Sequence, residues 1–124
     1  DLKEMKNEYD AISVENEELR EKARKLAEKE KAFSNKMNAA EAQRKIWRGI
    51  ILLESGKAAD AAAEFNAALE ADKSNGEAYK GLALAYEAQN DKANAKKHWQ
   101  AYIDTNPQEE DLMFAQKHLS DLGE

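Results

Sequence analysis

The sequence predicts an all-α protein in which an N-terminal coiled-coil helix precedes two antiparallel helix pairs and a capping helix. Three observations support this fold class. Charged residues make up 35% of the chain, and its abundant Ala, Glu, Lys, Leu and Arg are typical of long helices. The single proline, Pro107, and the five glycines leave few positions at which a helix must end. Finally, the chain has two periodicities, one of seven residues in its first third and one of 34 residues beyond it.

Residues 1–40 carry the seven-residue repeat and are predicted to form an oligomerising coiled coil. The core positions are Leu2, Tyr9, Asn16, Ala23, Glu30 and Met37 at a, and Met5, Ile12, Leu19, Leu26, Phe33 and Ala40 at d. All but Asn16 and Glu30 are apolar or alanine, and a repeat held this long favours a left-handed supercoil. One helix cannot bury such a stripe alone. The predicted oligomerisation residues are therefore Leu2, Met5, Tyr9, Ile12, Asn16, Leu19, Leu26 and Phe33.

The residues beside this stripe favour a parallel arrangement. In a parallel pair, each g residue faces the e residue five places further along the partner, which joins Asp1 with Lys6, Glu15 with Arg20, and Lys36 with Glu41. All three pairs are attractive, and each exposed pair contributes only ~0.3–0.5 kcal/mol. An asparagine at an a position also favours two strands in one register. We therefore favour a parallel dimer, with a trimer or a single solvated helix as alternatives.

Residues 42–75 align with residues 76–109 without a gap, at an offset of 34 residues. The aligned residues are similar in kind: Gly49 with Ala83, Gly56 with Asn90, Ala61 with Ala95, Phe65 with Trp99, and Leu69 with Ile103. A small residue lets two helices approach closely, and a large aromatic residue fills the space beyond it. Gly or Asn at a turn adopts the left-handed conformation that ends a helix. Each unit is therefore predicted to be a pair of helices joined by a tight turn.

This period and these residues resemble tetratricopeptide (TPR) repeats. The second unit carries the closer likeness, through Tyr79, Leu82, Ala83, Tyr86, Ala95, Trp99 and Pro107. The first unit keeps Gly49, Ala61, Phe65 and Ala68 but has Lys45, Arg48 and Lys73 at positions where the family usually has an aromatic residue, a leucine and a proline. The order of a coil followed by such repeats is also similar to that of the accessory proteins of the bacterial Tol-Pal system and of kinesin light chains.

Residues 110–124 are predicted to form a capping helix that closes the array, with Leu112, Ala115, Leu119 and Leu122 on its apolar side. No cap is evident at the other end. Two units are fewer than the roughly three that stable arrays need. We therefore expect the coil helix to continue into the first repeat around Asn38 to Ala42 and to replace the missing cap. The predicted domains are residues 1–40 and 41–124.

Composition and spacing argue against several classes of function. The net charge of −6 and the interleaved signs disfavour nucleic-acid binding, and no apolar run approaches the roughly 20 residues that span a bilayer. The chain contains no cysteine, and His98 and His118 stand apart from any group at metal-ligand or catalytic spacing. We therefore predict no enzyme activity, no metal and no cofactor. Because the chain begins at Asp1 without a methionine, it is interpreted as a fragment or a processed form.

The resemblance implies a binding groove lined by the first helix of each pair. Carried over by position, its residues are Gln43, Ile46, Ile50 and Leu53 in the first unit, Glu77, Lys80, Leu84 and Glu87 in the second, and Phe114 and His118 on the last helix. Leu84 stands where members that clamp a terminal carboxylate need an asparagine, so such a clamp is not expected. The predicted function is an oligomeric adaptor that binds a partner peptide or helix. The alternatives are a structural spacer, in which these apolar residues pack against the coil or another subunit, and a regulatory part of a larger protein.

Overall fold

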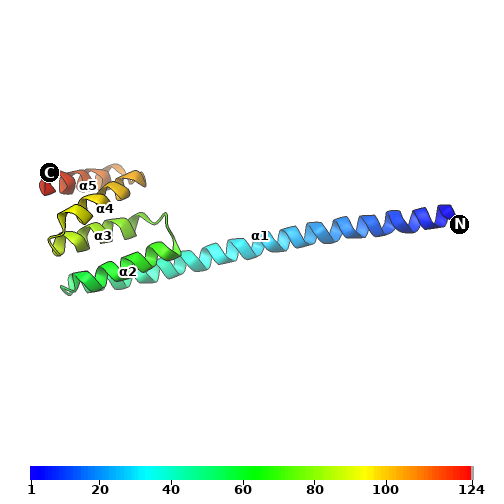
Figure 1. Ribbon diagram of the computed structural model, residues 1–124, viewed down its shortest axis with the longest axis horizontal. Coiled ribbons are helices and arrows are strands. Elements are labelled where there is room, and N and C mark those ends of the chain that lie inside the picture. Colours follow the sequence, from blue (N-terminus) through cyan, green and yellow to red (C-terminus); the bar gives the residue numbers. More distant parts are fainter. Residues whose placement is uncertain (124) are drawn as a thin grey trace. The chain divides into compact units, whose positions relative to one another are not determined.

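A computed structural model describes residues 1–123 of the chain and shows five helices and no strand within that range. The all-α class is confirmed. The helices are α1 (Leu2–Glu54), α2 (Ala58–Ala71), α3 (Gly76–Ala88), α4 (Lys92–Asp104) and α5 (Glu109–Leu122), as labelled in Figure 1. The contacts between residues divide the chain into two compact units, Asp1–Met37 and Asn38–Glu124, and each unit is described separately.

The first unit is a single stretch of α1 whose side chains are all exposed. Apart from Val14, its large apolar side chains stand at the predicted core positions, and the exposed fractions of these run from 56% for Ile12 to 84% for Leu2. Charged neighbours within the helix pair with each other, as when Arg24 donates to Glu21 and to Glu28. These contacts support the helix, but they leave the apolar stripe uncovered. The pairing of this stripe with other copies of the chain stays a prediction.

Helix α1 is uninterrupted through residues 38–42, so the predicted continuation of the helix is confirmed. No proline or glycine occurs in α1 before Gly49, so nothing in the sequence requires the helix to end earlier. Within the second unit, α1 ends at Glu54, and Gly56 follows in the left-handed conformation with φ 79°. A glycine adopts this conformation without strain.

The second unit repeats its geometry at the predicted offset. Helix α3 ends at Ala88, and Asn90 follows with φ 59°, so both predicted turn residues adopt the left-handed conformation. The starts of α2 and α4 are separated by the same offset, at Ala58 and Lys92. Four aligned core residues are fully buried: Ala61, Phe65, Ala95 and Trp99. Figure 1 shows α3 between α2 and α4, in agreement with the contacts among these helices.

The ring of Phe65 on α2 is packed between two glycines on neighbouring helices. A Cβ atom added to Gly49 on α1 would lie 2.6 Å from Cε1 of Phe65, and one added to Gly81 on α3 would come closer still. Phe65 itself is fully buried. A side chain at either glycine would therefore collide with the ring. The role of Gly49 follows from the repeat alignment, whereas Gly81 was not predicted.

Charged and polar side chains replace some of the contacts expected of a regular repeat. Lys45, which stands where TPR repeats usually have an aromatic residue, lies 3.7 Å from the carboxylate of Glu64, and both side chains are half-buried.

The side chain of Asn75 accepts from the backbone N–H of Ala78 at the start of α3. Asp91 accepts likewise from Asn94 at the start of α4. Helices α3 and α4 therefore begin with the side-chain caps that free backbone N–H groups need.

Helix α5 packs against α4 with the apolar side predicted for residues 110–124. Ala115 is fully buried next to Trp99, and Leu119 and Leu122 pack against the same cluster. The opposite side of α5 is exposed and carries charged residues such as Glu110, Lys117 and Asp121, together with the apolar Met113. The helix therefore covers the end of the helix array with a largely polar outer surface.

Candidate functional site

A groove of about 470 Å³ lies within the second unit. Helix α1 contributes one wall and α3 the other, while α2, α4 and α5 each add one residue. The lining residues are Ile46, Ile50, Leu53 and Glu54 from α1, Phe65 from α2, Glu77, Lys80, Gly81 and Leu84 from α3, Tyr102 from α4 and Asp111 from α5. Six of them belong to the set implied by the resemblance: Ile46, Ile50, Leu53, Glu77, Lys80 and Leu84.

The groove has an apolar floor of which only part is accessible. Ile46 and Phe65 are fully buried, so they support the floor without offering surface to a ligand. Ile50 is 42% exposed, and Leu53 and Leu84 are half-buried. These three side chains are therefore the apolar surface that a ligand could cover, and covering it would be favourable by roughly 25 cal/mol per Å².

The rim of the groove is predominantly acidic. Glu54, Glu77 and Asp111 line it together with a single basic residue, Lys80. Burial raises the pKa of the Tyr102 hydroxyl, and the negative charges of Asp111 and Glu77 raise it further. The two carboxylates near this phenol make the potential negative at this end of the groove. A cationic group is therefore favoured there over an anionic one.

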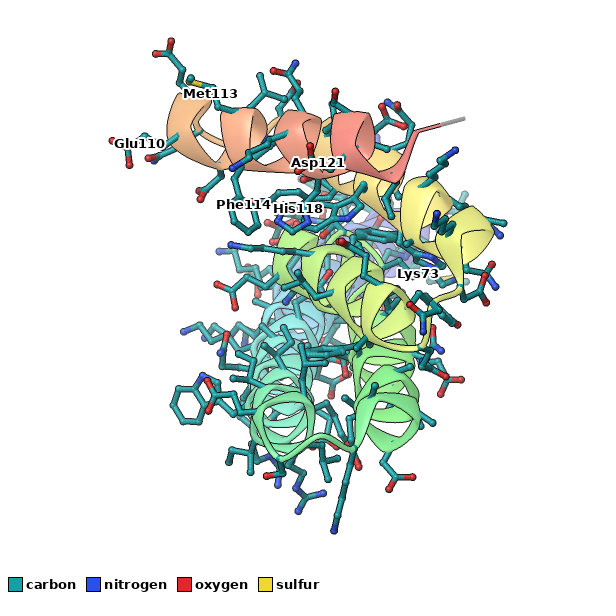
Figure 2. All side chains as sticks on the ribbon, turned by 90° about the vertical axis from the view of Figure 1, so that its left-hand side faces the viewer. Lys73, Glu110, Met113, Phe114, His118 and Asp121 are labelled. Atoms are coloured by element: carbon teal, nitrogen blue, oxygen red, sulfur yellow. The ribbon has the colours of Figure 1, made fainter. Side chains whose placement is uncertain are left out.

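Glu87, Phe114 and His118 form a cluster in which α5 meets α3 and α4. One carboxylate oxygen of Glu87, Oε2, accepts from Trp99 Nε1 at 2.7 Å and lies 2.8 Å from His118 Nδ1. The His118 ring lies 4.4 Å from the Phe114 ring and 4.8 Å from the Trp99 ring, measured between centroids. In Figure 2, Phe114 and His118 lie on the side of α5 that faces the other helices, whereas Met113 points away.

Two residues that were expected to contact a partner, Glu87 and His118, contact each other in this cluster. Glu87 and His118 are half-buried and bind each other, so their main contribution is to hold α5 against α3. Phe114 keeps 41% of its surface exposed, and the ammonium group of Lys80 lies 5.0 Å from its ring centroid. This distance is typical of a cation–π contact. Phe114 and Lys80 are therefore the accessible members of this region.

The remaining differences from the expected groove have physical causes. Gln43 is half-buried and does not line the groove. Glu54, Phe65, Gly81, Tyr102 and Asp111 line it without having been predicted. Asp111 reaches the rim only because α5 packs on α4, and no local pattern in the sequence indicates that placement. The repeat alignment could have indicated that Tyr102 is buried, because it pairs Tyr102 with Ala68 at the offset of 34 residues. The structure shows both residues buried.

Across residues 1–123, no group of three or more His, Cys, Asp or Glu side chains is arranged to hold a metal ion. His98 Nδ1 lies 2.7 Å from the backbone oxygen of Asn94, and the His98 and Tyr86 ring centroids are 5.1 Å apart with the rings tilted by 32°. None of the helices described has both the length and the apolar character needed to cross a bilayer.

Comparison of the chain with models of protein families, with curated proteins and with solved structures finds no match. A proposal for its function therefore depends on the residues of the groove and of the exposed stripe.

Proposed function

We propose that the chain is a protein-interaction adaptor that binds a peptide or helix of a partner protein in the groove between α1 and α3. The observation that carries this proposal is the combination of accessible apolar side chains, Ile50, Leu53 and Leu84, with a charged rim. Apolar anchors in a groove with polar edges are a common mode of peptide recognition. The site has the size expected of a binding pocket.

The repeat geometry supports an assignment to the TPR type. Helix ends, turn conformations and buried core residues recur at an offset of 34 residues, as at Gly56 and Asn90 or at Phe65 and Trp99. Arrays of this type bind ligands on the first helices of their pairs. In this chain those helices are the last part of α1 and α3, and they supply the walls of the groove.

The partner segment would be both apolar and basic. Side chains of Leu, Ile or Phe type would cover the floor, and Lys or Arg would face Glu54, Glu77 and Asp111. Charge complementarity of this kind speeds association and selects among partners more than it adds affinity. An acidic segment would be disfavoured, because Lys80 alone offers it a cation and already lies over Phe114.

Residues 1–40 would assemble copies of the adaptor as a parallel coiled coil. The exposed stripe from Leu2 to Phe33 follows the heptad positions, and the flanking charges pair attractively in a parallel arrangement. We favour a dimer over a trimer. Linking two or three grooves raises the effective concentration of each for a multivalent partner, so weak single contacts would become a stable complex.

The test is selection of peptides from a random library on the immobilised full-length chain. We expect enriched sequences with apolar anchors and flanking Lys or Arg. The Ile50→Asp/Leu84→Asp double variant should lose this enrichment while its circular dichroism stays helical. The matched control is Met113→Asp, at an exposed residue on the far side of α5, which should keep full enrichment. No enrichment by the wild-type chain, or equal loss in the control, would contradict the groove as the binding site.

A further inference from the structure

Helix α1 exposes a second apolar surface within the unit Asn38–Glu124, formed by Trp47, Ile50 and Ile51. Trp47 is 62% exposed and Ile51 is 63% exposed. The three side chains bound a shallow depression of about 280 Å³ to which no other residue contributes. An exposed tryptophan next to two isoleucines is unusual for a surface without a partner. The other tryptophan of the chain, Trp99, is fully buried.

The repeat alignment indicates that another helix would pack on this surface. At the offset of 34 residues, Trp47 corresponds to Gly81 and Ile51 to Ala85 on α3. Both are fully buried in the side of α3 that packs against α2, where Gly81 touches Phe65. The equivalent side of α1 is therefore the position at which another helix would pack. Since α1 has large side chains where α3 has small ones, this other helix must accept a tryptophan.

The heptad register identifies that helix. Counted in steps of seven from Met5 and Leu2, Trp47 falls at a d position, Ile51 at an a position and Ile50 at the adjacent g position. These are the positions at which parallel helices of one coiled coil meet their copies. Arg44, at the intervening a position, is exposed and lies next to Glu41 on the same helix. A parallel symmetric contact places each of these positions opposite its own copy.

We infer that a second copy of this chain covers Trp47 and Ile51, packing α1 against its own counterpart. The interface lies outside residues 1–40, to which the predicted oligomerisation residues are confined. It also replaces the helix that would precede α1 in a longer array, so each copy caps the other. The inference extends the proposed coiled coil and rests on it in part, and the experiment separates the two.

The experiment uses the absence of cysteine from the sequence. Three full-length variants, Ile51→Cys, Leu26→Cys and Asn66→Cys, each carry a unique thiol and keep Trp47, and they are oxidised at low micromolar concentration. Asn66 is exposed on α2 and serves as the collision control. We expect rapid disulfide-linked dimers for positions 51 and 26 and slow, concentration-dependent linkage for position 66. Linkage at 26 alone would overturn the inference and leave the coiled coil standing, and linkage at neither would overturn both.

Fluorescence of the wild-type chain provides a second readout that does not depend on variants. Trp99 is buried at any concentration, so acrylamide quenching reports chiefly on Trp47. We expect the quenchable fraction to fall as the chain assembles. Trp47→Ala should weaken assembly about 30-fold or more, as is typical of a central aromatic residue in an interface. A Trp47 that stays fully quenchable in the assembled chain would overturn the inference.

Discussion

Substitution of Gly81 by alanine tests the packing that holds α1, α2 and α3 together. The added methyl group would overlap the ring of Phe65, whose Cε1, Cζ and Cδ1 atoms are its three nearest neighbours. The ring also approaches Gly49 of α1, where an added Cβ would lie 2.6 Å from Cε1. Phe65 is fully buried and borders the groove, so relief of the overlap would have to push the ring toward the groove.

The size of the effect follows from two opposing terms. Overpacking of a close-packed core costs about 1–3 kcal/mol. Alanine is favoured over glycine within a helix by about 0.8–1 kcal/mol, which offsets part of that cost. We therefore expect Gly81→Ala to lower the free energy of unfolding by about 1 kcal/mol. For a unit of this size, such a loss lowers Tm by roughly 4–8 °C.

The assay is urea unfolding followed by tryptophan fluorescence, because Trp99 is buried in this unit and reports on its packing. A double-mutant cycle with Phe65→Leu is the control. Leucine is smaller than the ring, so the double variant should be more stable than the sum of the two single effects indicates, by about 1 kcal/mol. If Gly81→Ala instead raised stability by about 1 kcal/mol, the full gain from helix propensity, the proposed collision with Phe65 would be refuted.

Substitutions at three further residues test a helix cap, a turn and the cluster around α5. Asn94 donates to the Asp91 carboxylate from its side chain and its backbone N–H, which lowers the pKa of Asp91. The ionised carboxylate therefore stabilises the folded state above the unfolded-state pKa, and this stability is lost as pH falls through the folded-state pKa. We expect Asp91→Ala to lower Tm near neutral pH and to lower it less in acid. Thermal unfolding across pH measures this difference. Asn90 has φ 59°, so Asn90→Gly should keep or raise Tm while Asn90→Ala costs about 1 kcal/mol, and equal Tm values for the two would contradict this reason. Glu87→Ala leaves Trp99 Nε1 without its partner and should cost about 1–3 kcal/mol in urea unfolding, whereas Glu87→Gln keeps an acceptor oxygen and should cost less.

The helix pairs and their turns could be predicted because the repeat places like residues at like positions. Gly56 and Asn90 share no side-chain chemistry, yet both tolerate the left-handed conformation, and this common property identified the turns. Gly81 could not be predicted in this way, because its aligned residue is of a different kind. Its aligned residue is Trp47, so a comparison that looks for similar residues discards the pair.

The groove could be predicted only in part, because its two walls follow from the repeat, whereas part of its rim depends on how α5 packs. Ile50 and Leu84 occupy the same position of successive repeats, so sequence alone brings them together. Asp111 and the contact between Glu87 and His118 depend on how α5 packs against α3 and α4, across separations in sequence at which no periodicity applies. Asp111 was missed for that reason, whereas Glu77 on the same rim was predicted.

Phe65 contacts Gly49 on α1 and Gly81 on α3, and it also lines the groove. Its ring thus acts as a spacer that sets the distance between the two walls. A larger ring would part the walls and a smaller side chain would let them approach, so the width available to a ligand is encoded inside the core. Selection for a different ligand size would therefore act on the same residue as selection for stability, and the two properties could not evolve independently at this position.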